Sequence, residues 1–285
     1  MIFDDANFNF ETRDRIIVIG DIHGDIKRFK NILMDAKVIN NNLEWIANPQ
    51  DTMVIQVGDQ IDSANRTPEE NNWEVLDDIS VIHFTNSIDN IAKTKGGRVI
   101  SLIGNHELMN AMGNFSYVSQ KSHHENRIRY FMPSGSLSPI LSKRPIVLKV
   151  GQLLFCHAGI KKHHLETVEK YNKDIFHVND VWKNYILHNK ILQSDSEIFN
   201  KLLVHDDGIL WTRNQDDPMD LEYTLSKLGC VFVFVGHTTT YQIQLSHNKI
   251  WFTDNGISRA YGGDNDYQYI DIVNRQISVK TVKDT

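Results

Sequence analysis

The chain has 285 residues, a formal net charge of −6 and a hydrophobic content of 41%. This apolar content is enough for a buried core and excludes an intrinsically disordered chain, and the acidic balance does not favour a general nucleic-acid-binding protein. No apolar run approaches the roughly 20 residues that a membrane span needs, and the first residues lack the pattern of a secretory signal. The two cysteines, Cys156 and Cys230, lie in apolar runs typical of buried thiols. We therefore expect a soluble, cytoplasmic protein that contacts neither nucleic acid nor a membrane.

The first half of the chain alternates short apolar strands with helices. Runs rich in β-branched residues at 16–19, 52–57 and 98–103 predict three buried strands. Apolar residues at helical spacing follow the first two runs, at 26–36 and 75–82. This alternation favours a layered α/β core with mainly parallel strand pairing.

The second half contains more strand-like runs, at 146–150, 152–156, 230–235, 249–253, 267–273 and 276–282. The first two predict a tight hairpin through Gly151, and the last two predict another hairpin. We expect these runs to form a second, more antiparallel sheet that packs face to face with the first. The predicted fold class is therefore α/β, with two mixed β-sheets packed as a sandwich and flanked by helices.

Nothing between the two halves resembles a linker or a repeat, so we expect one domain over residues 1–285. Helical or loop insertions are predicted at about 108–145 and 160–208. Because loops at strand ends commonly carry function, these insertions are expected to lie over the groups that the strand ends present.

Five of the predicted strands are followed directly by polar side chains. The segments are VIGDIHGD (18–25), VGDQID (57–62), LIGNHE (102–107), FCHAG (155–159) and VGHTT (235–239). The side chains delivered are Asp21, His23, Asp59, Asp62, Asn105, His106, His157 and His237. Divalent cations take these carboxylate, amide and imidazole donors, and a preceding glycine lets the backbone turn close to an ion.

The donor set predicts more than one metal ion. Asp21 and His23 are two positions apart, so in an extended stretch they point the same way and can chelate one ion. No cysteine is among the candidates, which argues against a structural zinc site. A single Gly-Asp after a strand is usually only a turn, but five such segments together indicate a site with more ligands than one ion requires.

The order GDIHG, GDxxD, GNHE, HAG and GH resembles the calcineurin-like metallophosphoesterases, and its spacing is similar to their phosphoprotein phosphatase branch. The resemblance covers residues 15–262. Within that branch, LWTR (210–213) and DNGISRAYGG (254–263) are similar to segments of the Shewanella-like protein phosphatases. The family resemblance implies a single calcineurin-like metallophosphoesterase domain and a hydrolase that acts on phosphate monoesters.

The resemblance also implies two divalent metal ions, which would be manganese, iron or zinc, with manganese expected to serve in vitro. The ligands would be Asp21, His23 and Asp59 for the first ion, and Asp59, Asn105, His157 and His237 for the second. A hydroxide that bridges the two ions would attack the phosphorus directly.

His106 resembles the family's general acid, which protonates the leaving oxygen, and Asp62 would orient its ring. The arginine that follows the second aspartate in the eukaryotic enzymes is missing, because this chain has Ser63 there. Either Arg66 or Arg213 would then grip the phosphate, and the position of Arg213 in LWTR favours it.

Three further residues bear on the site. Tyr261 is expected either to lean over the substrate or to pack as a core aromatic residue. Asp254 is a candidate hydrogen-bond partner of a metal-binding histidine. Thr239 stands where phosphodiesterases of the superfamily have a second histidine, which favours the phosphatase branch.

The leading hypothesis is a protein phosphatase whose substrate is a phosphorylated protein or a small phosphate ester. The residues leave open phosphoserine, phosphothreonine and phosphotyrosine. A hydrolase of dinucleoside tetraphosphates is the alternative, because such enzymes share the motif order. A non-catalytic protein-binding scaffold is disfavoured, because every ligand position is filled. The sequence assigns no oligomeric state.

Overall fold

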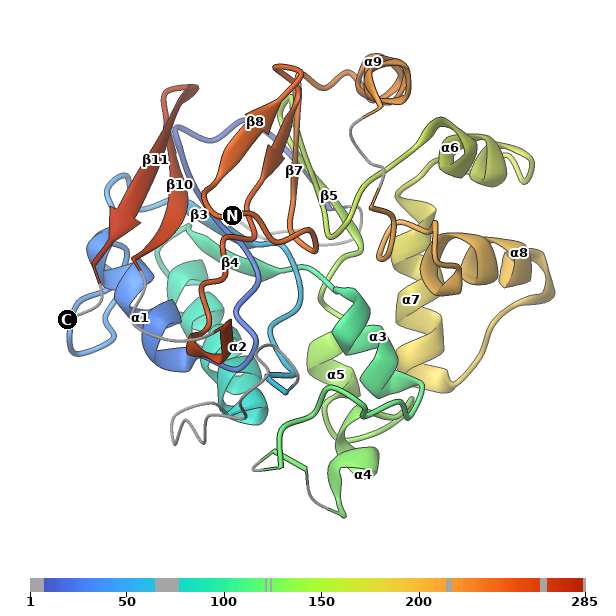
Figure 1. Ribbon diagram of the computed structural model, residues 1–285, viewed down its shortest axis with the longest axis horizontal. Helices are drawn as coiled ribbons and strands as arrows, with labels where there is room; N and C mark the ends of the chain where they lie inside the picture. Colours follow the sequence, from blue (N-terminus) through green and yellow to red (C-terminus); the bar gives the residue numbers. More distant parts are fainter. Residues whose placement is uncertain are drawn as a thin grey trace.

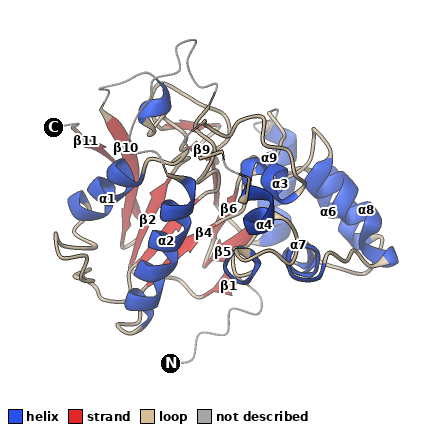
Figure 2. Cartoon of the chain, turned by 90° about the horizontal axis from the view of Figure 1, so that it is seen from below, coloured by secondary structure: helices blue, strands red, loops and turns tan. Residues whose placement is uncertain are grey.

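The structure is a computed structural model that describes residues 8–64, 77–120, 122–123, 125–213, 217–261 and 266–283. Two mixed β-sheets pack face to face, and helices cover the outer face of each sheet (Figures 1 and 2). The predicted α/β sandwich is therefore confirmed.

The first sheet has five strands in the order β11-β10-β2-β3-β4. Its centre is β2 (Arg15–Ile19), β3 (Met53–Gln56) and β4 (Arg98–Ser101), which pair in parallel as predicted. Helices α1 (Ile26–Asp35) and α2 (Asp78–Lys93) pack on its outer face. Since side chains alternate along a strand, both faces of these strands are buried, and their sequences are continuous apolar runs.

The second sheet has six strands in the order β1-β5-β6-β7-β9-β8. They are β1 (Asn9–Phe10), β5 (Val147–Val150), β6 (Leu153–Cys156), β7 (Phe232–Val235), β8 (Gln244–Ser246) and β9 (Ile250–Phe252). The predicted hairpin through Gly151 joins β5 to β6. This sheet is no more antiparallel than the first, because β6, β7 and β9 pair in parallel.

One part of the predicted topology is wrong. Strands β10 (Tyr267–Val273) and β11 (Gln276–Val282) form the expected hairpin, but they extend the first sheet rather than the second. Neighbouring strands in sequence usually share a sheet, and that tendency misled the prediction. Here β10 pairs with the open edge of β2, where Ile270 and Ile272 fill the core between the sheets.

The predicted insertion ranges hold helices and loops in the part of the chain that the structure describes. The elements within or overlapping these ranges are α3 (Asn105–Ala111), which begins before the first range, α4 (Arg127–Phe131), α5 (Ser138–Leu141), α6 (Lys162–Glu169), α7 (His177–His188), a 3-10 turn (Gln193–Asp195), α8 (Ser196–Ile198) and a π-helix (Phe199–Val204). With α9 (Pro218–Leu228), they form the helical side of the molecule beyond the second sheet (Figure 1). Their status as insertions remains a prediction.

Both cysteines are buried free thiols, as expected. Burial raises the pKa of the Cys156 thiol well above its usual range. Among the described helices, none has the length and apolar character that crossing a membrane requires.

Candidate active site

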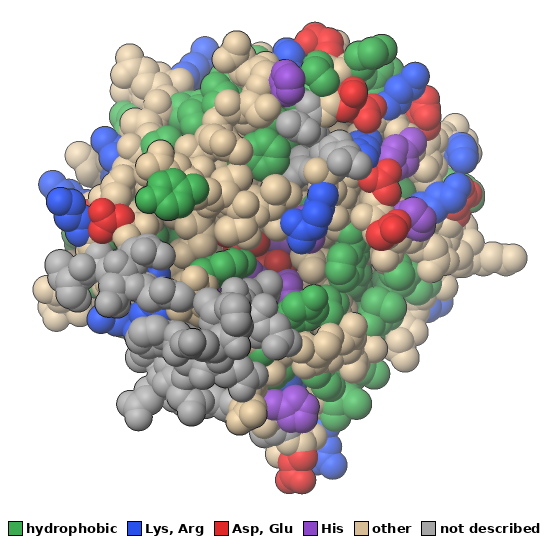
Figure 3. Space-filling model, in the orientation of Figure 1, with side chains coloured by type: hydrophobic (Ala, Val, Ile, Leu, Met, Phe, Trp, Pro, Cys, Tyr) green, Lys and Arg blue, Asp and Glu red, His purple; other side chains and the backbone are tan. Residues whose placement is uncertain are grey.

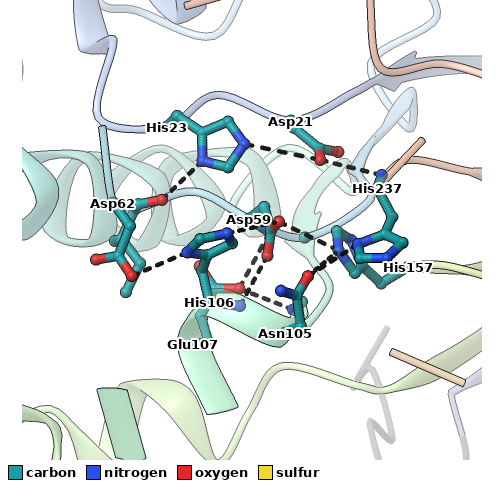
Figure 4. Close-up of polar contacts among 12 residues, drawn as sticks. Asp21, His23, Asp59, Asp62, Asn105, His106, Glu107, His157 and His237 are labelled. Carbon is teal, nitrogen blue, oxygen red and sulfur yellow. Dashed lines mark hydrogen bonds and ion pairs between the residues drawn. The ribbon is translucent and has the colours of Figure 1, made fainter. Parts of the chain in front are cut away.

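The five predicted strand ends meet at one edge of the sandwich. Asp21 follows β2, Asp59 follows β3, Asn105 follows β4, His157 follows β6 and His237 follows β7. Three of these strands belong to the first sheet and two to the second. Figure 4 shows their side chains gathered around Asp59. The sequence therefore located the residues that the fold brings together.

Asp59 lies between two groups of potential metal ligands. One group joins its carboxylate to His23 and His106, the other joins it to His157 and His237, and the ligand atoms within each group lie within 4.8 Å of one another. The Asp59 carboxylate is shared by both groups, and its role as a bridge between two ions remains a prediction. The first group contains His106, which the resemblance assigns to acid catalysis rather than to metal binding.

Each of the three predicted histidine ligands is held by a backbone carbonyl oxygen. The pairs, all 2.9 Å between ring nitrogen and oxygen, are His23 with Ile61, His157 with Val57 and His237 with Trp211. Since a carbonyl oxygen only accepts, that ring nitrogen donates, and the other nitrogen of a neutral ring carries the lone pair. This is how metal-binding histidines are oriented in proteins.

Asn105 lies beside two of these histidines. Its Oδ1 lies 2.9 Å from His157 Nε2 and 3.0 Å from His237 Nδ1. Burial opposes the charged form of His157, but Asp59 outweighs it and raises the pKa to about 10. Burial and the nearby charge of His157 lower the pKa of His237 to about 3. The Asn105 oxygen and the neutral His237 nitrogen are thus acceptors that converge beside a carboxylate, which suits a cation.

Asp21 has a buried carboxylate with one oxygen that accepts no hydrogen bond. Its Oδ2 accepts the His237 backbone N–H at 3.0 Å and lies 3.9 Å from His23 Nε2, while its buried Oδ1 has no hydrogen-bond partner. Burial, followed by the negative charge of Asp254, raises the pKa of Asp21 well above its usual range. An ion at Oδ1 would stabilise the carboxylate, so the residue fits its predicted role as a ligand.

Asp254 lies beside this carboxylate and accepts hydrogen bonds from Thr239 Oγ1 at 2.6 Å and from the Gly256 N–H at 3.1 Å. Its predicted hydrogen bond to a metal-binding histidine stays a prediction. The contact with Thr239 shows a different use of that threonine: it fixes the loop after His237.

His106 and Asp62 form the predicted pair. His106 Nδ1 lies 3.0 Å from Asp62 Oδ2, and the carboxylate is fully buried. The backbone N–H of His106 donates to Asp59 Oδ1 at 3.0 Å, and its Nε2 lies 3.7 Å from Asp59 Oδ2. One ring nitrogen of His106 therefore contacts Asp62, and the other lies beside the Asp59 carboxylate.

The backbone at these strand ends adopts unusual conformations. His23, Asp59, Asp62 and His237 have φ values of 42°, 52°, 69° and 62°. Residues other than glycine rarely adopt this left-handed backbone conformation unless the surrounding structure holds them there. One of the glycines at these strand ends, Gly104, is required by the space around it, because a Cβ there would collide with the Asp59 carboxylate. The close approach of the loops, rather than backbone freedom, requires glycine at that position.

Glu107 is a site residue to which the sequence assigned no role. Its carboxylate is fully buried and accepts the backbone N–H groups of Asp59 at 3.0 Å, Gln60 at 2.8 Å and Gly104 at 2.7 Å. It thereby ties the loop after β3 to the loop after β4 (Figure 4). The GNHE segment contained Glu107, but no pattern in the sequence indicated that it faces inward.

A cleft of about 840 Å³ opens over the cluster. Figure 3 shows acidic and histidine side chains at the floor of a hollow near the middle of the face in view. Aromatic residues border it: the rings of Tyr117 and Tyr261 lie 5.0 Å from His106 and 5.8 Å from His23, and Trp211 also lines the cleft. The sequence did not predict Tyr117, which follows α3 in a loop without a recognisable motif.

Two cations line the described part of the cleft. Lys161 forms an ion pair with Asp207 at 2.7 Å, whereas Arg213 is an exposed residue whose Nη1 donates to the His237 carbonyl at 3.2 Å. The structure therefore brings Arg213 to the predicted ligands. Arg66, the other arginine predicted to bind phosphate, lies outside the described residues.

A β-sandwich whose strand ends present aspartate, asparagine and histidine around a shared carboxylate defines a class of metal-dependent hydrolases of phosphate esters. Residues 14–241 match the calcineurin-like phosphoesterase family, and the chain belongs to that family. It is therefore a phosphatase, and the family implies divalent metal ions. The converging acceptors at Asn105 and the unpartnered oxygen of Asp21 fit such ions.

Relatives support the phosphoprotein phosphatase branch. Shewanella-like protein phosphatase 1 of Plasmodium berghei (strain Anka) is 28% identical over 273 residues, which cover 88% of this chain and 69% of the relative. Shewanella-like protein phosphatase 2 of Arabidopsis thaliana is 24% identical over 215 residues, covering 58% of this chain and 52% of the relative. The alignment with the Arabidopsis protein thus spans about half of its length.

Solved structures share the fold. A cold-active protein-tyrosine phosphatase of a psychrophile Shewanella species superimposes with a TM-score of 0.76 at 20% identity, covering 99% of this chain and 83% of that chain. A protein serine/threonine phosphatase from Saccharomyces cerevisiae gives 0.61 at 13% identity, with coverages of 99% and 87%. Both confirm the calcineurin-like fold, and at these identities they carry nothing about substrate.

Proposed function

We propose that this chain is a protein phosphatase that hydrolyses phosphate monoesters on proteins. The observation that carries the proposal is the His106–Asp62 pair, 3.0 Å between Nδ1 and Oδ2, beside a cluster of metal ligands. The proposed ligands are Asp21, His23, Asp59, Asn105, His157 and His237. When bound, two divalent ions supply Lewis-acid charge and acidify a water to serve as the nucleophile.

The chain's own residues provide the rest of the chemistry. His106 gives the proton on Nε2 to the leaving oxygen as the bond from phosphorus breaks, and Asp62 holds the ring through Nδ1. Arg213, which lines the cleft, binds the phosphate through its guanidinium fork. Tyr261 forms a wall of the cleft beside His23, where it can contact the group that the phosphate esterifies.

The protein substrate is supported by the relatives and by the cleft. Two relatives bear the name Shewanella-like protein phosphatase. The cleft of about 840 Å³ is much larger than a phosphate group and has aromatic walls. These features suit a phosphorylated side chain on a polypeptide, with Tyr117 and Tyr261 beside the reacting group.

Hydrolysis of p-nitrophenyl phosphate tests the proposal. Protein stripped of metal should be inactive and should recover turnover with manganese. Asp59→Asn should abolish that turnover, and His106→Asn should lower the turnover of phenyl phosphate, whose leaving oxygen needs a proton, by about 100-fold or more, the usual contribution of a general acid. His177→Asn is a matched control, because His177 also pairs with a carboxylate, Asp195, at 3.0 Å but lies outside the cleft. Full activity of Asp59→Asn would refute the proposal.

Substrate class is tested by comparing phosphotyrosine, phosphoserine and phosphothreonine peptides with a dinucleoside tetraphosphate. We expect turnover of a phosphopeptide to exceed that of the nucleotide. A preference for the nucleotide would keep the metal chemistry and overturn the protein substrate. A manganese-loaded protein that hydrolyses none of these compounds would instead favour a non-catalytic scaffold.

A further inference from the structure

A buried arginine stands behind the proposed acid pair. Arg127, on the short helix α4, is 1% exposed, and its guanidinium contacts polar groups on several segments. Nη2 donates to Asp62 Oδ1 at 2.9 Å, and Nε donates to Asn110 Oδ1 at 2.8 Å. Nη1 forms an ion pair with Asp78 Oδ2 at 2.9 Å and donates to the Ser122 carbonyl at 3.2 Å. Arg127 is not among the residues that line the cleft.

The two oxygens of Asp62 have different partners. Oδ1 accepts from Arg127, whereas Oδ2 accepts from Asn110 Nδ2 at 2.8 Å and faces His106 Nδ1 at 3.0 Å. A carboxylate held at both oxygens cannot rotate, so Arg127 fixes the oxygen that His106 uses. Asn110 links the same groups a second time, because it donates to Asp62 and accepts from Arg127.

Arg127 also balances the charge of two neighbouring carboxylates. Asp62 and Asp78 are 0% and 1% exposed, and the Asp62 backbone N–H donates to Asp78 Oδ1 at 3.1 Å. Two buried carboxylates this close repel one another unless a cation lies between them. Arg127 reaches both from a position 65 residues after Asp62.

We propose that Arg127 is a positioning residue for the phosphatase reaction: it locks Asp62, and through Asp62 it keeps the His106 imidazole aimed at the leaving-group oxygen. This inference rests on the proposed function, in which His106 is the general acid. The arginine that eukaryotic enzymes carry after their second aspartate is replaced by Ser63 here. Arg127 meets the same aspartate from another element, behind the acid pair rather than in the cleft.

Leaving-group chemistry tests the proposal. Nitrophenolate leaves with little help from an acid, whereas phenolate is a stronger base and needs its proton. We expect Arg127→Met to lower kcat by about tenfold more on phenyl phosphate than on p-nitrophenyl phosphate, with little change in KM. Arg98→Met is the control, because Arg98 is also buried and paired with an aspartate, Asp89, at 3.0 Å, but lies at the start of β4. It should show equal effects on both substrates.

A double-mutant cycle separates positioning from general damage. If Arg127 acts through His106, Arg127→Met in a His106→Asn background should cause no further loss of kcat on phenyl phosphate. An equal loss in both backgrounds would overturn the proposal and leave the proposed function intact. If His106→Asn alone shows no dependence on the leaving group, the proposed acid itself fails.

Arg127→Lys keeps the test decisive if Arg127→Met does not fold. Lysine retains the charge, but its single ammonium cannot reach Asp62, Asp78 and Asn110 together. We expect folded protein with a reduced kcat on phenyl phosphate and a nearly normal rate on p-nitrophenyl phosphate. A wild-type ratio of the two rates in Arg127→Lys would show that charge alone suffices, and would overturn positioning by the guanidinium fork.

Discussion

Replacing Asp25 by asparagine should strongly destabilise the protein, because it breaks a buried ion pair that closes the site. Asp25 is 0% exposed, and its carboxylate accepts hydrogen bonds from Arg259 Nε at 2.8 Å and Nη2 at 2.7 Å. It also accepts the Arg259 backbone N–H at 3.0 Å. Arg259 begins the 3-10 turn Arg259–Tyr261, so the pair ties the wall carrying Tyr261 to the loop carrying His23.

The size of the effect follows from burial. Removing one partner of a buried ion pair costs about 3–5 kcal/mol, because the other charge is left without compensation. For 285 residues the entropy of unfolding is about 0.6 kcal/mol/K, so the expected fall in Tm is about 5–8 °C. Asparagine can still cap α1, where Asp25 accepts the Arg28 N–H at 3.1 Å, so loss of the cap adds little.

Thermal unfolding of wild type, Asp25→Asn and Asp77→Asn checks this. Asp77 is the corresponding N-cap of α2, where it accepts the Ser80 N–H at 3.0 Å at the exposed surface. Its replacement should cost less than about 1 kcal/mol. Because the Tyr261 wall is released, Asp25→Asn should also raise KM for p-nitrophenyl phosphate. Equal Tm values for the two variants would refute the reasoning.

Three further predictions concern burial and close contact. Burial holds the pKa of His164 at about 3, below the value of about 6.5 in the unfolded chain. The stability that the neutral His164 side chain contributes is therefore complete above pH 6.5 and is lost as the pH falls toward 3. Unfolding free energy measured against pH should therefore fall less steeply in His164→Gln. Cys156 should react with a thiol reagent only on unfolding, which labelling with and without denaturant would show. Gly104→Ala should lower turnover by at least about tenfold, because its Cβ would displace the Asp59 carboxylate; normal kinetics would contradict that contact.

Much of the site could be predicted because its residues follow strands directly. A buried strand has a clear sequence signature, and the carboxyl ends of neighbouring parallel strands lie at one edge of a sheet. Hence the sequence alone places Asp21, Asp59 and Asn105 together. His157 and His237 joined them through the family resemblance, because the second sheet was expected to be more antiparallel, whereas β6 and β7 pair in parallel.

Other features could not be predicted, because they depend on contacts that sequence spacing does not encode. Arg127 reaches Asp62 across 65 residues from a short helix, and nothing in its neighbourhood distinguishes it from a surface arginine. Glu107 faces inward only because two loops present N–H groups to it. The placement of β10 failed for a related reason: pairing with β2 fills an open sheet edge that exists only in three dimensions.

The proposed metal ligands come from both sheets of the sandwich, so ion binding and the docking of the two sheets are coupled. An ion held by Asp59 together with His157 would cross-link the segments that follow β3 and β6, which belong to different sheets. Metal affinity would then depend on how firmly the two sheets pack together as well as on the ligands themselves. By the same coupling, loosening the core at Phe155, which is fully buried between the sheets, would weaken metal binding without touching an ion.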